Sequence, residues 1–108
     1  MGKVRKILHA KGHDIFSVEP TSMVYRAVEI MCEKNIGGLL ILENGKLVGI
    51  FTDRDYARKL ILKGKSSKDT PISELMTTNL VTVTPDTSID DCMRVKKKKK
   101  IRHLPVLD

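Results

Sequence analysis

An internal repeat constrains the fold of this chain more than any other feature of its sequence. Shifting the sequence against itself until Pro20 meets Pro85 aligns the two halves without a gap. Ile15–Val18 then falls on Leu80–Val83, and further along the chain hydrophobic positions keep meeting hydrophobic positions. A chain of 108 residues that repeats in this way is predicted to fold as two half-sized units of the same design.

The first half of each copy predicts a strand followed by a helix. Ile15–Val18 has the composition of a short strand, which ends before the aligned proline. The hydroxyl side chains of Thr21 and Ser22 are suited to cap the next helix, as are those of Thr87 and Ser88 in the second copy. Hydrophobic residues at spacings of three and four then predict one buried stripe on that helix. The stripe consists of Val24, Ala27, Val28 and Met31.

The second half of the first copy predicts a hairpin and another helix. Leu39–Leu42 is hydrophobic at every position, which is typical of a strand buried on both faces. Asn44-Gly45 is the strongest short signal for a hairpin turn, and Leu47–Phe51 is the returning strand. A helix is expected over residues 53–62. Its predicted inward residues are Tyr56, Leu60 and Ile61.

The repeat pattern divides the chain into two copies and a connection. Residues 1–63 form the first copy, residues 64–69 the linker and residues 70–108 the second copy. The second copy lacks counterparts of the returning strand and the last helix, so a longer chain or a neighbouring chain is expected to supply them. A short helix is expected to begin at Thr70-Pro71. Its hydrophobic face is Ile72, Leu75 and Met76.

Two segments of this pattern resemble one known family. Gly49–Asp55 reads Gly-Ile-Phe-Thr-Asp-Arg-Asp, and Ile101–Asp108 reads Ile-Arg-His-Leu-Pro-Val-Leu-Asp. Both resemble the CBS domain, named for cystathionine β-synthase, and the tandem copies resemble a Bateman module. The resemblance implies an α/β (α+β) fold in which each repeat packs a small three-stranded sheet against two helices. It also implies that the two repeats are related by a pseudo-twofold axis.

The resemblance to the CBS domain implies a function as well. CBS pairs bind an adenosyl ligand, such as AMP, ADP, ATP or S-adenosylmethionine, in the cleft between repeats. They act as energy or metabolite sensors that regulate an attached or partner protein, and they are not enzymes. No catalytic residue, no required cofactor and no metal site is therefore expected. Such pairs commonly associate side by side through their helices, which predicts a homodimer.

Thr52 and Asp55 are the most specific of the predicted ligand contacts. In the family, the threonine of the motif Gly-x-x-Thr-x-x-Asp contacts phosphate and its aspartate binds the ribose hydroxyls, roles that fall here on Thr52 and Asp55. A helix that starts directly after a strand presents free N–H groups to an anion, and a carboxylate accepts hydrogen bonds from a diol. The same spacing fits a capping box with Asp in place of the usual Glu or Gln, and both roles can coexist.

Further ligand contacts are implied where the strands begin. Glycine lets a ligand approach the backbone closely, although a plain turn between helix and strand explains Gly37 and Gly38 equally well. Cations suit a phosphate, although Arg102 and His103 also fit as solvated residues beside a strand. The remaining predicted ligand-binding residues are Ser17 and Val18 at the adenine, Ile36, Gly37 and Gly38 in the pocket wall, and Arg102 and His103 near the shared cleft.

The formal net charge of +7 comes from one segment. Arg94, Lys96–Lys100 and Arg102 carry seven positive charges, so the rest of the chain is neutral overall. Lys96 interrupts a hydrophobic stripe whose other members are Ile89, Cys92 and Met93. The alternative function is a dimerisation or interaction module, or a nucleic-acid-binding module, that uses the basic segment 94–102. No aromatic side chain lies among these cations to stack on bases, so a solvated basic face is the simpler interpretation.

The cysteines and histidines indicate neither a disulfide scaffold nor a metal site. Cys32 and Cys92 fall in predicted helices, which favours two reduced, half-buried thiols and a cytoplasmic location. His9 and His13 are four residues apart, but a glycine between them disfavours a helix and no third ligand is placed. Leu39–Leu42 is the longest aliphatic run and is too short to span a membrane, so no membrane partner is expected.

Overall fold

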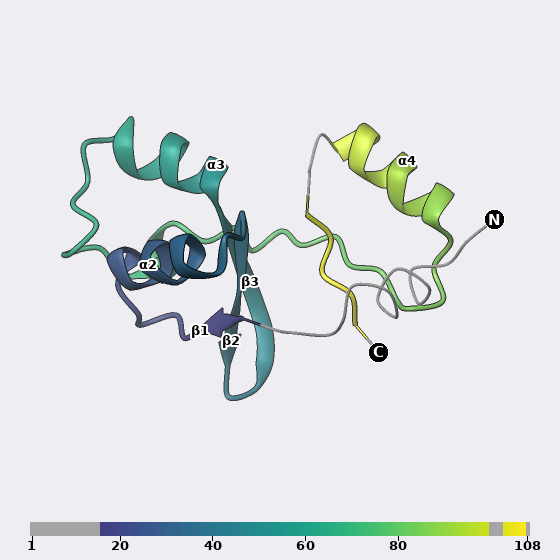
Figure 1. Cartoon of the computed structure of the whole chain (residues 1–108), viewed down its shortest axis with the longest axis horizontal. Coiled ribbons are helices and arrows are strands. Elements are labelled where there is room, and N and C mark those ends of the chain that lie inside the picture. The colour runs from purple at the N-terminus through teal and green to yellow at the C-terminus, as the bar shows by residue number, and fades with distance from the viewer. Residues whose placement is uncertain (1–15, 100–102, 108) are drawn as a thin grey trace. The chain divides into compact units, whose positions relative to one another are not determined.

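The computed structural model describes residues 16–99 and 103–107. Within that range the chain forms two compact units (Figure 1). The first unit comprises residues 16–80, and the second comprises residues 81–99 together with 103–107. Residues 70–80 pack within the first unit, where their hydrophobic side chains join its core.

A three-stranded sheet organises the first unit. Its strands are β1 (Ser17–Val18), β2 (Gly38–Glu43) and β3 (Lys46–Thr52), in the order β1-β2-β3. β1 runs parallel to β2, and β2 and β3 form an antiparallel hairpin. Asn44 and Gly45 form its turn with φ angles of 52° and 77°. This confirms the predicted hairpin, because both central residues of such a tight turn need positive φ.

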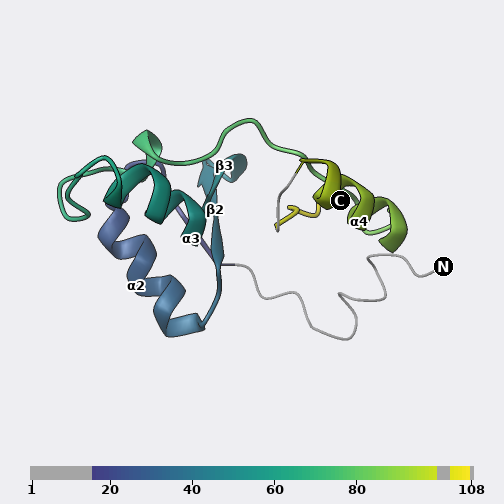
Figure 2. The ribbon, with the colours of Figure 1, turned by 90° about the horizontal axis from the view of Figure 1, so that it is seen from above.

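One helix, α2 (Val24–Lys34), packs on the sheet through its predicted hydrophobic stripe. The helix is followed by the C-cap residue Asn35, whose left-handed conformation has a φ of 53°. Figures 1 and 2 show α2 on the same side of the sheet as the helix that follows β3. Val28 is only partly buried, and the buried members of the stripe are Val24, Ala27 and Met31.

The N-terminus of α2 is capped by backbone carbonyls of distant residues rather than by a side chain. The first two N–H groups of the helix donate to the backbone carbonyls of Thr70 and Ser67, each at 2.9 Å. Within residues 16–99 and 103–107, no side-chain cap hydrogen bond is made at this first turn. The prediction that Thr21 or Ser22 caps α2 is therefore wrong, because backbone carbonyls of residues 67 and 70 already occupy these donors.

The helix that follows β3 is irregular. It begins as α3 (Asp53–Asp55) and continues as a π-helix over Tyr56–Ile61, with the wider hydrogen-bond spacing of that form. Tyr56 is partly buried and Leu60 is buried, as predicted. Ile61 is 58% exposed, so its predicted inward position is wrong. Leu60 fills the side of the last turn that faces the core, and Ile61 lies away from it.

The core of the first unit covers one face of the sheet. Leu39 and Ile41 of β2 are buried, whereas Leu40 and Leu42 between them are only partly buried. The prediction that β2 is buried on both faces therefore holds for one face alone. A single 3₁₀ turn, Ile72–Glu74, follows the linker. The buried core residues are Val24, Ala27, Met31, Leu39, Ile41, Phe51, Leu60, Ile72 and Leu75.

The second unit contains the helix α4 (Ile89–Lys99) and one parallel bridge between Val83 and Val106. Ser88 caps α4 by accepting a hydrogen bond from a first-turn N–H at 3.1 Å, which confirms the predicted cap. Met93 is 61% exposed, so it does not belong to the stripe predicted for this helix. The partly buried positions of α4 are Ile89, Cys92, Val95 and Lys96. In the described part of the chain, no helix is long and hydrophobic enough to cross a membrane.

Candidate ligand-binding site

The sheet brings three of the predicted site residues to one end. Gly38 pairs with Thr52 across β2 and β3. The carbonyl of Gly37 accepts a hydrogen bond from the N–H of Asp53 at 3.0 Å. The start of β2 and the end of β3 therefore place the glycine pair directly beside the first turn of the helix 53–61.

Three further predicted residues lie on or next to β1 and β2. Ser17 pairs with Leu40 and is exposed. Val18 and Ile36 are partly buried and pack against the core of the first unit. Neither Gly37 nor Gly38 has a positive φ, so backbone conformation does not explain why glycine stands there.

Thr52 and Asp55 form the capping box that their spacing predicts. The N–H of Asp55 donates to Thr52 Oγ1 at 3.2 Å, and the N–H of Thr52 donates to Asp55 Oδ2 at 3.0 Å. The Thr52 hydroxyl donates to the same Oδ2 at 3.2 Å. The box fixes the Asp55 carboxylate at the point where β3 becomes a helix.

Lys59 and Thr77, which sequence reasoning missed, hold the second oxygen of this carboxylate. Asp55 Oδ1 accepts a hydrogen bond from the Thr77 hydroxyl at 3.0 Å and forms an ion pair with Lys59 Nζ at 3.0 Å. The spacing of Asp55 and Lys59 is that of helical ion pairs, and it was a usable signal. Thr77 arrives from a distant part of the chain, and no local pattern indicates it. Asp55, which is 7% exposed, is thus a buried carboxylate facing an ammonium group.

The backbone N–H groups at this helix start are less available than predicted. The N–H of Asp53 donates to the Gly37 carbonyl, and the N–H of Asp55 donates to the Thr52 hydroxyl. Two of the donors expected to face an anion therefore already bond within the protein. The main chemical feature of the site is the Asp55 carboxylate, not an anion-binding helix end.

The ligand contacts predicted in the second copy are Arg102 and His103. Arg102 lies outside the described residues, as do His9 and His13, which are not predicted contacts. His103 belongs to the second unit, where it is partly buried and makes an interaction of its own.

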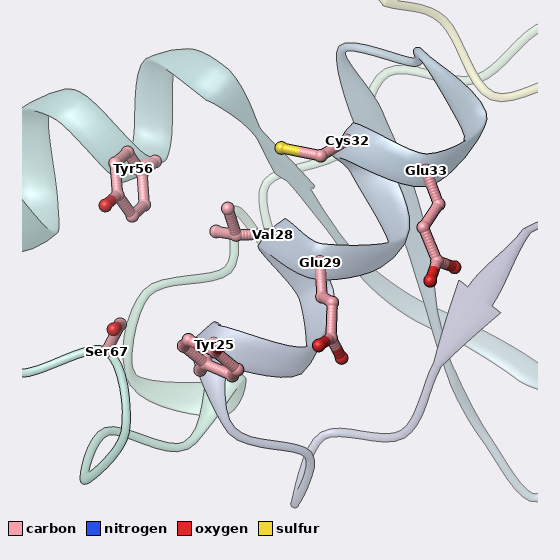
Figure 3. Close-up of a pocket in the computed structure, with 7 residues that line it drawn as sticks. All are labelled: Tyr25, Val28, Glu29, Cys32, Glu33, Tyr56 and Ser67. Atoms are coloured by element: carbon pink, nitrogen blue, oxygen red, sulfur yellow. The ribbon is translucent and has the colours of Figure 1, made fainter.

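A groove of about 400 Å³ lies elsewhere on the first unit, between α2 and the π-helix. Figure 3 shows Val28 and Cys32 pointing toward the helix that carries Tyr56, while Glu29 and Glu33 point away from it. Cys32 is exposed, so the predicted half-burial is wrong for this thiol, whereas Cys92 is partly buried as predicted. Among the described residues, none of the predicted ligand contacts borders the groove, whose lining residues are Tyr25, Val28, Glu29, Cys32, Glu33, Tyr56 and Ser67.

Sequence comparisons find relatives that share this repeat. The CBS domain family matches residues 4–62 and 72–108. The CBS domain-containing protein CBSX3, mitochondrial, of Arabidopsis thaliana is 43% identical over 89 residues, which is 78% of this chain. The CBS domain-containing protein YhcV of Bacillus subtilis is 34% identical over 94 residues, which is 87% of this chain. The matched regions span 43% and 66% of the two relatives, so this chain covers less than two thirds of their length.

Solved structures match the fold along the whole chain. A protein with CBS domains from Burkholderia ambifaria superposes with a TM-score of 0.96 at 43% identity, covering 99% of this chain and 81% of that one. The CBS domain pair of protein MJ0100, in complex with 5′-methylthioadenosine and S-adenosylmethionine, gives 0.88 at 30% identity, covering 100% and 82%. Two matched segments in one chain and a common fold lead to the same conclusion. The chain belongs to the CBS-domain family and has the fold of a CBS domain pair.

Proposed function

We propose that this chain is a non-catalytic regulatory module that binds an adenosyl compound (AMP, ADP, ATP or S-adenosylmethionine) and reports an energy or metabolite signal. The observation that carries the proposal is the Asp55 carboxylate, fixed by Thr52 at the end of β3. A carboxylate only accepts hydrogen bonds, which matches a donating hydroxyl of a ribose. The complex of the MJ0100 pair with two adenosyl compounds supports the proposal.

The proposal commits to the adenosine part of the ligand. The two compounds named with MJ0100 both contain adenosine, and neither carries a phosphate. Asp55 therefore binds the ribose of every candidate ligand. The other proposed contacts are Ser17 and Val18 at the adenine and Ile36, Gly37 and Gly38 in the pocket wall. The contact between Thr52 and phosphate applies to AMP, ADP and ATP alone.

Replacing the carboxylate tests the proposal. Asp55→Asn keeps one acceptor oxygen for the capping box but removes the charge and one strong acceptor. We expect the Kd of the bound adenosyl compound to rise by at least about tenfold, because hydrogen bonds to charged groups contribute roughly 1.5–3 kcal/mol. Isothermal titration calorimetry with AMP, ADP, ATP and S-adenosylmethionine measures this, and circular dichroism verifies the fold.

The matched control is Asp69→Asn, which changes an exposed carboxylate of the linker in the same way. Its affinity should equal that of the unaltered chain. An unchanged Kd in the Asp55→Asn protein would remove Asp55 from the site. Failure of all four compounds to bind would overturn the adenosyl proposal itself.

The proposal also includes the working form of the module. Two copies associate through their helical faces and regulate a partner protein in the cytoplasm. Exposed hydrophobic side chains on the two helices support the association. Tyr25, which lines the groove, is 47% exposed, and Ile61 on the π-helix is 58% exposed. The free thiols of Cys32 and Cys92 support a reducing compartment.

A further inference from the structure

We propose that Thr77 sets the affinity of the adenosyl site by competing with the ligand for Asp55 Oδ1, while Lys59 is the positioning residue that holds this oxygen. The inference rests on the proposed function, because it concerns how ribose hydroxyls reach Asp55. It deepens that function by naming a residue outside the Gly-x-x-Thr-x-x-Asp motif that controls access to the carboxylate.

The Asp55 carboxylate already accepts as many hydrogen bonds as it has lone-pair positions. A carboxylate offers about four lone-pair positions. Thr52 takes two of them at Oδ2, through its N–H at 3.0 Å and its hydroxyl at 3.2 Å. Thr77 and Lys59 take the other two at Oδ1, each at 3.0 Å. A ribose hydroxyl can therefore bond to Asp55 only by replacing one of these partners.

The partners of Asp55 differ in what it costs to replace them with a ribose hydroxyl. The bonds from Thr52 form the helix cap, and losing them would leave the start of the helix 53–61 unsatisfied. Lys59 Nζ carries a full charge and also donates to the Leu75 carbonyl at 3.1 Å, so removing it would strand a buried carboxylate. The Thr77 hydroxyl is neutral, and it accepts a hydrogen bond from Lys59 Nζ at 3.3 Å whether or not it donates to Asp55. It is the partner whose exchange costs least.

The backbone of Thr77 is bound to the sheet next to its hydroxyl. Thr77 also pairs with Ile50 on β3, donating its N–H at 2.8 Å and accepting from the Ile50 N–H at 3.0 Å. Exchange of the hydroxyl therefore removes one of the four hydrogen bonds that Thr77 makes to β3 and to the helix 53–61. Binding effects of this kind are reciprocal, so the ligand loosens residues 75–77 by the same factor by which their attachment weakens the ligand.

The test removes the competing hydroxyl and keeps the shape of the side chain. In Thr77→Val, we expect AMP and S-adenosylmethionine to bind with a Kd lower by roughly threefold to tenfold, the range that one exchanged hydrogen bond covers. Thr77→Ser keeps the hydroxyl and should restore the original affinity. Thr78→Val makes the same change at the adjacent exposed position and should leave the Kd unchanged. In the unaltered chain, saturation with the bound compound should accelerate hydrogen exchange at the Thr77 amide.

The outcomes separate this inference from the proposed function. If Thr77→Val binds with unchanged or weaker affinity while Asp55→Asn loses binding, the competition is wrong and the adenosyl site stands. Slower exchange at the Thr77 amide on binding would also overturn the competition. If Asp55→Asn binds normally, or the unaltered chain binds neither compound, the proposed function fails and this inference fails with it.

Discussion

Gly49 is the one glycine of the Gly-x-x-Thr-x-x-Asp motif, and packing explains its small size. Its φ is not positive, so its backbone conformation is open to any residue. A Cβ atom at this position would lie 2.8 Å from Met76 Sδ and 3.2 Å from the Thr77 carbonyl oxygen. The absence of a side chain at Gly49 thus leaves space for Met76 and Thr77, and Thr77 is the residue that contacts Asp55.

Adding that methyl group should destabilise the first unit. For Gly49→Ala we expect the free energy of unfolding to fall by about 1–3 kcal/mol, the usual cost of overpacking a filled site. Urea denaturation followed by circular dichroism measures the change. The double variant Gly49→Ala/Met76→Ala removes the nearest contact, so its loss should be smaller than the sum of the two single losses. Additive losses would show that Met76 is not the obstacle.

At the same scale, sequence reasoning reached only half of the site. The contact between Thr52 and Asp55 follows from a local rule, because residues three apart at a helix start face each other. A similar rule predicts Lys59, because oppositely charged residues four apart on a helix form ion pairs. Thr77 depends on how the chain returns to β3 after the linker, and that path is decided by tertiary packing.

At the scale of elements, the two described α-helices of eleven residues begin in different ways. The first N–H groups of α2 donate to the backbone carbonyls of Ser67 and Thr70, whereas a first-turn N–H of α4 donates to the side chain of Ser88. Local sequence predicted the second correctly and the first wrongly, since both starts carry a hydroxyl pair. The difference arises because the linker folds back onto α2, and such a contact leaves no trace in the residues around the helix start.

This difference predicts unequal effects for the same substitution. Ser88→Ala should destabilise α4 by about 1 kcal/mol, because it removes the acceptor for a first-turn N–H. Ser22→Ala should change stability by less than about 0.5 kcal/mol, as is usual for a side chain outside such contacts. Hydrogen exchange at the first-turn amides of α4 and α2 measures each effect locally. Equal protection losses in the two helices would contradict the assignment of the caps.

Local signals were otherwise sufficient for most elements of the first unit. The Asn44-Gly45 turn and the stripe of α2 were predicted because a turn needs particular φ angles and a helix needs particular spacings. The π-helix over Tyr56–Ile61 was not, since its residues have an ordinary helical pattern. The exposure of Ile61 and Met93 also depends on what packs nearby, which composition does not reveal.

At the scale of the whole molecule, the proposed dimer gives the groove between α2 and the π-helix a role. Cys32 is exposed and points into it, so a larger charged side chain there should fit the folded monomer but obstruct a second copy. We expect Cys32→Arg to sediment as a monomer at concentrations where the unaltered chain is a dimer. Sedimentation velocity measures this.

The control for that experiment places the same side chain far from the groove. Glu43→Arg changes an exposed residue at the end of β2 and should keep the dimer. A dimer that survives Cys32→Arg would show that the copies meet through another surface. A monomeric unaltered chain would remove the homodimer from the proposal.

The edges of the small sheet have a consequence for how this chain behaves at high concentration. Open strand edges invite pairing with other chains and lead to aggregation. β1 is only two residues long, so it offers few backbone N–H and C=O groups for another chain to pair with. On β3, Thr77 already occupies the N–H and carbonyl of Ile50 in the middle of the strand. The segment that holds Asp55 therefore also interrupts the longer edge, and lifting it away would turn that edge into a template for fibre growth.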